Sequence, residues 1–201
     1  MTLSDLVDRL PQLRLEAGTA LGAHDVAHAT LLVVRDGVVV IRTAVPGSSR
    51  RTITCNAATG SVVLPPGEDE KLVALTAATI ATISADLRDG LIASPDAARL
   101  LVDGLVETLR QKHDTIAGLS RVHHVDRVRG KLIELAREHG RVGRDGIRLD
   151  FPLTHDLLGE MVGSARETVT RALDELQREG FVVRRGRTYS VQLEPEQLAS
   201  S

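Results

Sequence analysis

Hydrophobic residues between positions 12 and 85 occur in short runs separated by glycine and proline. Two runs rich in Val, Leu and Ile flank the turn residues 35–37, and the short runs are 31–34, 38–43, 52–54, 60–64, 72–75 and 79–83. Short β-branched runs with Gly and Pro between them predict strands joined by tight turns. Their close spacing predicts a small antiparallel β-roll in the N-terminal part of the chain.

A helical pattern starts at Ser94. A capping side chain, proline at the first helical position and an acid in the first turn predict a helix that runs to about Ser120. Its apolar positions alternate spacings of four and three residues, as in the seam of a coiled coil. We expect the seam to pair with a second copy of the chain; the alternative is a helix packed wholly on its own β-roll. The seam consists of Ala98, Val102, Leu105, Leu109, Lys112, Ile116 and Leu119, and Leu101 and Val106 widen it toward the β-roll.

Residues 153–179 predict two helices joined by a short turn. Thr154 can cap a first helix that ends near Met161, and Gly163 permits a tight turn. Ser164 and Glu167 have the spacing of a capping box, which predicts the start of the second helix. Two helices joined by a short turn with glycine are typical of a helix-turn-helix.

The second predicted helix has an apolar face and a polar face. The apolar face consists of Val169, Ala172, Leu173 and Leu176, and the polar face of Arg166, Glu167, Thr170 and Arg171. The polar face lies in the first turns, the end that a recognition helix presents to base edges. Arginine pairs bidentately with guanine and glutamate accepts from the cytosine amino group, so we predict that these four side chains read DNA bases. The alternative is a solvated face with an ion pair between Glu167 and Arg171.

The segment after the second helix predicts a basic wing. Two short apolar runs, 181–183 and 188–191, flank a glycine turn that carries Arg184, Arg185 and Arg187. We expect these arginines to lie beside the DNA phosphates; a basic hairpin without a DNA role is the alternative. Further expected backbone contacts are the N-terminus of the second helix with Thr168, together with Thr154 and Ser164.

Residues 163–171, with the sequence GSARETVTR, resemble the recognition-helix motif of the Crp/Fnr family of bacterial transcription regulators. The resemblance follows the chain in order, as β-roll, long helix, hinge near 122–125 and winged helix. It implies a homodimer that places two recognition helices in successive major grooves of a palindromic site. It also implies GTGA-like half-sites read by Arg166, Glu167 and Arg171, and RNA polymerase as a partner if the protein is an activator. Ala165 replaces a serine frequent in the family, which removes one phosphate contact.

The N-terminal part departs from the cyclic-nucleotide-binding members that it resembles. Those members hold the cyclic phosphate with an arginine and the ribose with a glutamate. The matching stretch, 59–74, is short, its only glycine-glutamate pair ends at Glu68, and no arginine lies between Arg51 and Arg88. Lys71 lacks the planar fork of arginine.

We therefore expect a degenerate effector domain that does not bind cyclic AMP in the usual mode. In the family, residues with hydroxyl side chains on the long helix contact the adenine. The corresponding positions of this chain fall near Lys112 and His113. The alternative is a sensor that requires an unusual nucleotide, haem or a metal ligand in order to bind DNA.

Scattered histidines and one cysteine leave their roles open. His24 and His28, four residues apart, could ligate a metal or haem if helical, and His123 and His124 could make the hinge sensitive to pH. Cys55 is either a redox sensor or a buried filler. The sequence contains no paired-carboxylate, Ser-His-Asp or phosphate-loop signature, so we expect no enzyme, no catalytic residue, no metal site and no cofactor.

Composition adds a charge asymmetry and an aromatic asymmetry. Residues 1–120 hold 11 basic and 14 acidic side chains, whereas residues 121–193 hold 14 basic and 11 acidic ones, a net −3 against +3. All three aromatic residues lie near the C-terminus, and we expect Phe151, Phe181 and Tyr189 to pack the small core there. No apolar run approaches the roughly 20 residues of a membrane helix and the start does not look like a secretory signal, so we expect a cytoplasmic protein.

Together these patterns predict an α+β chain with an N-terminal antiparallel β-roll, a dimerisation helix and a winged helix-turn-helix. The expected domains are 1–93, 94–121 and 122–193, followed by a tail at 194–201, and the last domain includes a helix over 125–139 and a turn-rich connection over 140–146.

Overall fold

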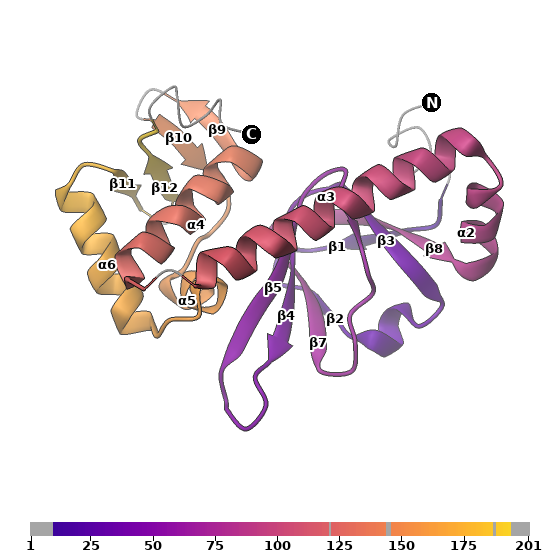
Figure 1. The fold of residues 1–201 in the computed structure, drawn as a ribbon, viewed down its shortest axis with the longest axis horizontal. Helices are drawn as coiled ribbons and strands as arrows, with labels where there is room; N and C mark the ends of the chain where they lie inside the picture. The colour runs from indigo at the N-terminus through magenta and orange to yellow at the C-terminus, as the bar shows by residue number, and fades with distance from the viewer. Residues whose placement is uncertain (1–9, 121, 144–145, 187, 194–201) are drawn as a thin grey trace. The chain divides into compact units, whose positions relative to one another are not determined.

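The computed structural model describes residues 10–120, 122–143, 146–186 and 188–193. The chain divides into two compact units, Met1–Asp114 and Thr115–Ser201. The predicted α+β class is confirmed, with antiparallel sheets in the first unit and a helix-turn-helix with wing strands in the second (Figure 1).

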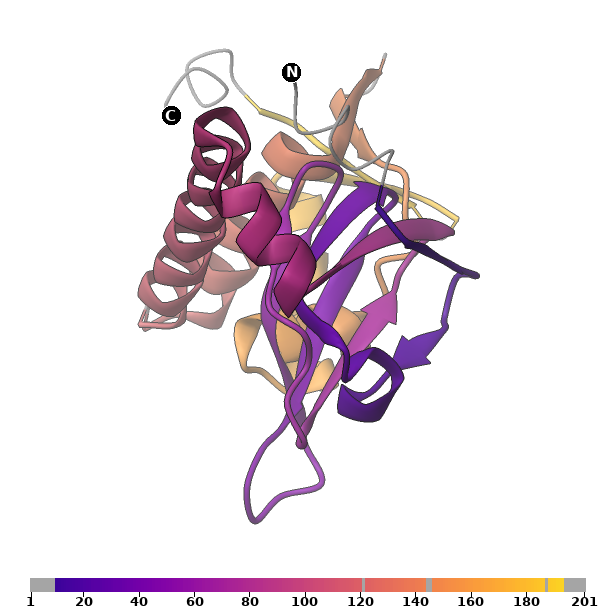
Figure 2. The ribbon, with the colours of Figure 1, turned by 90° about the vertical axis from the view of Figure 1, so that its right-hand side faces the viewer.

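The described residues of the first unit form two four-stranded antiparallel sheets, together with helices. The first sheet has the order β1 (Gln12–Leu15), β8 (Ala78–Ser84), β3 (Ala29–Asp36) and β6 (Val62–Val63). The second has the order β2 (Ala20–Leu21), β7 (Glu70–Ala74), β4 (Val39–Ala44) and β5 (Arg51–Ala57), and the hairpin of β4 and β5 projects from the unit (Figure 2). A short 3-10 helix, η1 (Ala23–Val26), follows β2.

The strands on either side of Gly37 form as predicted, but they belong to different sheets. β3 pairs with β6 and β8, whereas β4 pairs with β5 and β7. Gly37 has a φ of +88°, and a Cβ there would come within 2.4 Å of the Ala77 carbonyl oxygen. Only glycine fits this crossing between the two sheets, because it tolerates both the left-handed backbone and the close contact.

The continuous apolar run 31–34 is explained by burial on both faces of β3. Leu32 and Val34 point into the core between the two sheets, while Leu31 and Val33 pack in a second core with Leu101. Alternate side chains of a strand point to opposite faces, so a strand covered on both sides needs apolar residues throughout.

The predicted long helix is α3 (Pro95–Leu119), and it packs on the first unit along one face. Gly104 lets it approach β6, since a Cβ there would lie 2.4 Å from Val62 Cγ2. Thr108 Oγ1 donates to the Val62 carbonyl at 2.6 Å. Leu105, which we expected in the dimer seam, packs partly buried against the β-roll, whereas Val106, which we expected toward the roll, is 39% exposed.

Helix α2 (Ala85–Ile92) was not predicted. It follows β8 directly, with Ser84 as its N-cap. None of its residues is buried, and it contains Gly90. A short helix without a buried stripe produces no helical period in the sequence, which is why the pattern missed it.

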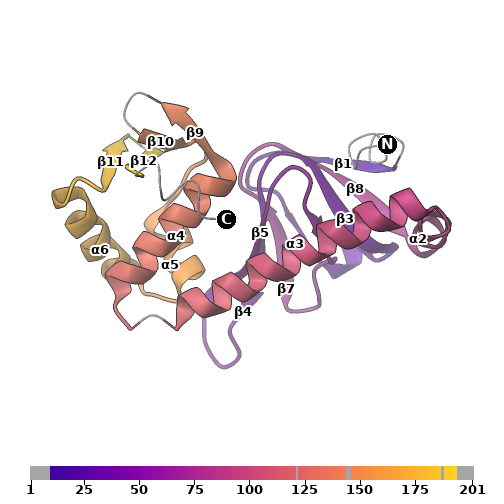
Figure 3. The same ribbon diagram turned by 45° about the horizontal axis from the view of Figure 1, so that its top comes forward.

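Among its described residues, the second unit contains the end of α3, three further helices and a four-stranded sheet (Figure 3). The helices are α4 (His124–His139), α5 (His155–Val162) and α6 (Arg166–Arg178). The sheet has the order β11 (Val182–Arg185), β12 (Thr188–Val191), β10 (Gly146–Leu149) and β9 (Gly140–Gly143). The prediction of α4 is confirmed.

The prediction of a turn-rich connection over 140–146 is wrong, because β9 and β10 form a hairpin there. Three of the four residues of β9 are exposed, so the strand has no apolar alternation that a sequence pattern could detect. Its pairing is decided by the neighbouring β10, which lies between β9 and β12.

Two of the three aromatic residues pack the core of the second unit as expected. Phe151 and Tyr189 are each 2% exposed. Phe181 is only partly buried, and its ring lies 4.7 Å below the Arg129 guanidinium in a cation–π contact. Within the described ranges, no helix combines the length and the apolarity needed to cross a membrane.

Candidate nucleic-acid interface

The helix-turn-helix is formed by α5, the turn at Gly163, and α6. Thr154 is the N-cap of α5, as predicted, and its hydroxyl accepts from the Leu157 amide at 3.1 Å. Gly163 takes the left-handed conformation, with φ +63° and ψ +33°, and its amide donates to the Gly159 carbonyl. The glycine thus ends α5 and turns the chain into α6 without backbone strain.

The predicted capping box of Ser164 and Glu167 is wrong. The N-cap of α6 is Ala165, which offers no side-chain acceptor. Ser164 is only 6% exposed, and its hydroxyl lies 2.9 Å from His124 Nδ1 and 3.3 Å from Arg127 Nη2. Ser164 therefore ties the turn to α4 instead of capping α6, and its buried hydroxyl does not favour the expected phosphate contact.

Helix α6 has the two faces that the sequence predicts. Val169, Ala172, Leu173 and Leu176 are buried. Arg166, Glu167 and Arg171 are exposed on the other side, in the first turns. Among the described residues, Glu167 and Arg171 form no ion pair with each other, whereas Arg166 does pair with an acid.

Arg166 is oriented by an acid from the preceding helix. Its Nη1 lies 3.2 Å from Asp156 Oδ2, and both side chains are more than half exposed. Ion pairs of this kind are worth about 1 kcal/mol or less. A stronger partner, such as a phosphate or a guanine edge, can therefore displace Asp156 at little cost.

His155, at the start of α5, connects both helices to the wing, a role that the sequence pattern did not predict. Its Nδ1 lies 2.8 Å from Thr170 Oγ1, and its Nε2 lies 3.0 Å from the Tyr189 hydroxyl. Thr170 Oγ1 in turn donates to the Arg166 carbonyl at 3.0 Å. No sequence pattern relates positions that lie 15 and 34 residues apart.

Burial lowers the pKa of His155, and the charges of Arg184 and Arg166 lower it further, against the opposing effect of Asp174 and Asp156. Burial also raises the pKa of Tyr189. At neutral pH the imidazole is therefore uncharged and the phenol keeps its proton.

The basic wing forms as predicted, with Gly186 in a left-handed conformation between β11 and β12. Arg184 Nε donates to the Gly186 carbonyl at 3.1 Å, and its guanidinium lies 5.9 Å from the centre of the Tyr189 ring. Arg184 and Arg185 are both exposed, while Arg187 lies outside the described residues. The wing thus carries exposed positive charge, and both Arg184 and Arg166 lie near enough to His155 to lower its pKa.

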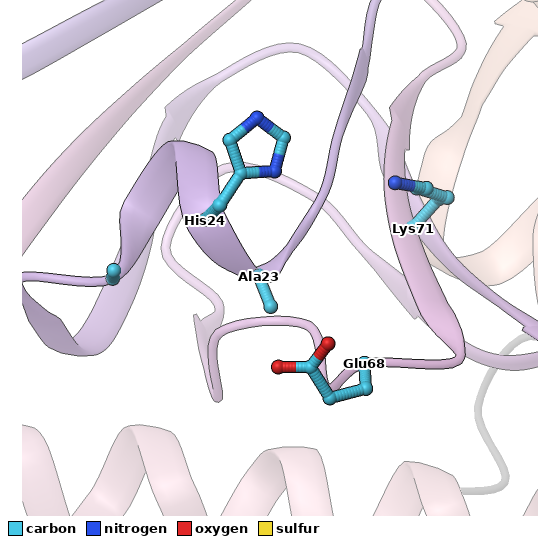
Figure 4. Close-up of a pocket in the computed structure, with 5 residues that line it drawn as sticks. Ala23, His24, Glu68 and Lys71 are labelled. Carbon is cyan, nitrogen blue, oxygen red and sulfur yellow. The ribbon is translucent and has the colours of Figure 1, made fainter.

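The first unit holds a pocket of about 450 Å³. Ala23, His24, Ala27, Glu68 and Lys71 line it, and Figure 4 shows His24 and Lys71 on opposite sides of the hollow with Glu68 near its floor. The described residues that line it include one lysine and no arginine.

Outside the pocket that His24 lines, the described histidines of the first unit and Cys55 form no evident site. Cys55 lies buried in the core between the two sheets, which favours a filler over a redox sensor. His24 pairs with Asp25 at 3.0 Å, and His28, His113 and His123 are exposed. The described part of the chain contains no group of three or more His, Cys, Asp or Glu that could hold a metal.

Comparison with known proteins matches residues 126–201 to the family of Crp-like helix-turn-helix domains. The chain is 37% identical over 89 residues to the global nitrogen regulator of Synechocystis sp., which is 44% of this chain and 39% of that protein. It is 27% identical over 129 residues to the CRP-like cAMP-activated global transcriptional regulator of Mycobacterium tuberculosis, which is 63% of this chain and 57% of that protein. The chain thus spans less than two thirds of the length of these curated relatives.

The fold extends the likeness beyond the C-terminal domain. A solved CRP-family transcriptional regulator from Thermus thermophilus superposes with a TM-score of 0.76 at 18% identity, over 94% of this chain and 97% of that one. Residues 126–201 thus match the Crp-like helix-turn-helix domain, and the described part of the chain shares its α+β fold with this solved structure.

Proposed function

We propose that this protein is a sequence-specific, DNA-binding transcription regulator that acts as a homodimer on a palindromic site, and not an enzyme. The observation that carries the proposal is the exposed first turns of α6, where Arg166, Glu167 and Arg171 lie opposite the buried face of the helix. A helix that is anchored on one side and offers Arg and Glu on the other has the chemistry of direct readout.

The surroundings of α6 supply the contacts that would position it on DNA. Ala165 leaves the first amides of α6 without a side-chain cap, and such amides bind phosphate. Thr168 lies on the same turn, Thr154 is exposed at the start of α5, and Arg184 and Arg185 extend the positive charge onto the wing. These groups are the proposed backbone contacts, and the half-site is GTGA-like by resemblance.

Helix α3 supports the proposed dimer. Leu109 is 68% exposed and Ile116 is 70% exposed, and their seven-residue spacing from each other and from the exposed Val102 places the three on one side of the helix. An apolar stripe of this kind on one chain is typical of a surface that another subunit covers. Two copies related by a two-fold axis would present two α6 helices to a palindrome, and RNA polymerase is a further partner if the protein activates transcription.

The test is selection of bound sequences from a randomised duplex pool by the full chain, followed by titration of the selected duplex. Each bidentate base contact is worth about 1–3 kcal/mol, so Arg166→Ala with Glu167→Ala should reduce sequence preference by roughly 100-fold. The dimer should stay intact. Arg178→Ala, which removes an exposed arginine from the last turn of the same helix, is the matched control and should keep the preference. A wild-type protein that selects no sequence, or a double variant that selects the same one, would refute the proposal.

A second candidate is a sensor that needs a ligand in order to bind DNA. The pocket lined by His24, Glu68 and Lys71 favours it, since it could hold an anionic ligand. The lining does not favour cyclic AMP in the usual mode, because lysine cannot offer the bidentate fork of arginine. Thermal shift with a panel of cyclic mono- and dinucleotides, haemin and divalent metals separates the two. No shift with any of them, together with tight DNA binding by ligand-free protein, would remove the sensor.

A further inference from the structure

Four groups from three elements form one continuous hydrogen-bonded chain in the second unit. It runs from the Tyr189 hydroxyl on β12 to both ring nitrogens of His155 on α5, then to Thr170 Oγ1 and the Arg166 carbonyl on α6. The distances along it are 3.0, 2.8 and 3.0 Å. It therefore joins the wing to the first turns of α6 through a single imidazole.

The available protons fix the direction of every bond. The Arg166 carbonyl can only accept, so the Thr170 hydroxyl must donate to it. Because the hydroxyl donates its one proton to that carbonyl, Thr170 Oγ1 can only accept from His155 Nδ1–H. A neutral imidazole with a proton on Nδ1 has a lone pair on Nε2, which then accepts from the Tyr189 hydroxyl.

The charges around the ring are consistent with this neutral form. Arg184 on β11 and Arg166 on α6 oppose a further positive charge, while Asp174 on α6 and Asp156 on α5 favour one. Together with burial, the net effect lowers the pKa of His155, so the ring keeps one proton at neutral pH. A second proton would place an N–H against the Tyr189 hydroxyl and reverse the bond there.

We propose that His155 is a positioning residue: donating from Nδ1 to Thr170 and accepting at Nε2 from Tyr189, it locks the wing onto α6 and withholds the Thr170 hydroxyl proton from DNA. The part of this inference that concerns DNA rests on the function proposed above. It assigns hydrogen-bond donation to bases on α6 to Arg166 and Arg171, with Glu167 as an acceptor, and it excludes the Thr170 hydroxyl as a donor to bases. The hydroxyl could donate to a base only by giving up its bond to the Arg166 carbonyl.

The first test needs no DNA. Nitrogen-15 NMR of the histidine rings in the full chain, with His155→Asn to assign the signal, should show His155 protonated on Nδ1 alone at neutral pH. Tyr189→Phe removes only the donor to Nε2, so it should keep the proton on Nδ1 and shift the Nε2 signal. Thr170→Val removes the acceptor of Nδ1–H, so it should yield mixed tautomers. Thr168→Val is the matched control, because Thr168 lies on the same helix outside the chain of bonds, and it should leave the signal unchanged. Protonation on Nε2 in the wild type, or an unchanged signal in Tyr189→Phe, would overturn the inference.

The second test measures the affinity and sequence preference of DNA binding. Tyr189→Phe and Thr170→Val should weaken binding to the selected duplex by roughly 3- to 10-fold, the worth of one hydrogen bond, while selecting the same bases as the wild type. A changed base preference in Thr170→Val would mean that the hydroxyl reads DNA, and the inference would be wrong. If the wild type selects no sequence at all, the proposed function fails instead, and the tautomer still decides whether His155 holds the three elements together.

Discussion

At the scale of single residues, burial decides the chemistry of a histidine that its place in the sequence does not distinguish. His139 ends α4, its side chain is 3% exposed, and its ring meets Phe151 edge to face at 6.0 Å. Loss of solvation lowers its pKa to about 4. Its Nε2 lies 3.4 Å from a carboxylate oxygen of Glu138, but a neutral imidazole forms no ion pair there at neutral pH.

This burial predicts a loss of stability in acid. Unfolded His139 takes up a proton near pH 6.5, whereas the folded residue resists protonation until about pH 4, so acid favours the unfolded state between these values. The free energy of unfolding of the second unit should fall by about 3 kcal/mol across that window. Denaturant titrations at several pH values would measure it.

The contribution of His139 is isolated by comparing variants, since carboxylates also titrate near pH 4. His139→Leu should flatten the fall between pH 6.5 and 4, and His123→Gln, at an exposed histidine next to the same helix, should not. An equal pH dependence in His139→Leu and the wild type would show that the folded residue is not held neutral.

At the scale of elements, glycine affects stability differently at two helical positions of the first unit, Gly104 and Gly90. Glycine in a helix costs about 1 kcal/mol relative to alanine. At Gly104 this cost allows α3 to approach β6, because a Cβ would meet Val62 Cγ2 at 2.4 Å. At Gly90 in α2 a Cβ would meet nothing within 4 Å, so the glycine has no packing role there.

Two alanine substitutions should therefore change stability in opposite directions. Gly104→Ala should destabilise the first unit by about 1–3 kcal/mol, since overpacking outweighs the gain in helix propensity. Gly90→Ala should stabilise it by up to about 1 kcal/mol. Denaturant unfolding of the full chain measures both, and a stabilised Gly104→Ala variant would mean that the helix does not rest on Val62.

At the scale of the whole molecule, the exposed stripe on α3 determines the expected assembly. One face of α3 packs on the β-roll through Leu101, Leu105 and Thr108, so this face is already covered within one chain. Leu109 and Ile116 have no such cover among the described residues, which leaves the other face for a second copy.

Charging this stripe should separate the subunits. Leu109→Lys with Ile116→Lys places two charges at the centre of the proposed interface, where burial would be unfavourable. We expect a monomer in analytical ultracentrifugation and weak binding to the palindrome. Asp103→Lys, at an exposed position of α3 outside the seam, is the control and should remain dimeric. A dimeric double variant would place the interface elsewhere.

The sequence alone determined the local features of this protein. Some features depend only on residues that are neighbours in the sequence, so spacing and propensity were enough to predict them. They are the starts of two helices at Ser94 and Thr154, the turn at Gly163 and the buried face of α6. Tertiary structure decided the rest. It placed β3 and β4 in different sheets and paired the exposed β9. It made Ala165 the N-cap of α6, with Ser164 in contact with His124, and it placed His155 between Thr170 and Tyr189. These outcomes depend on groups far apart in the chain, whose contacts form only when the elements pack.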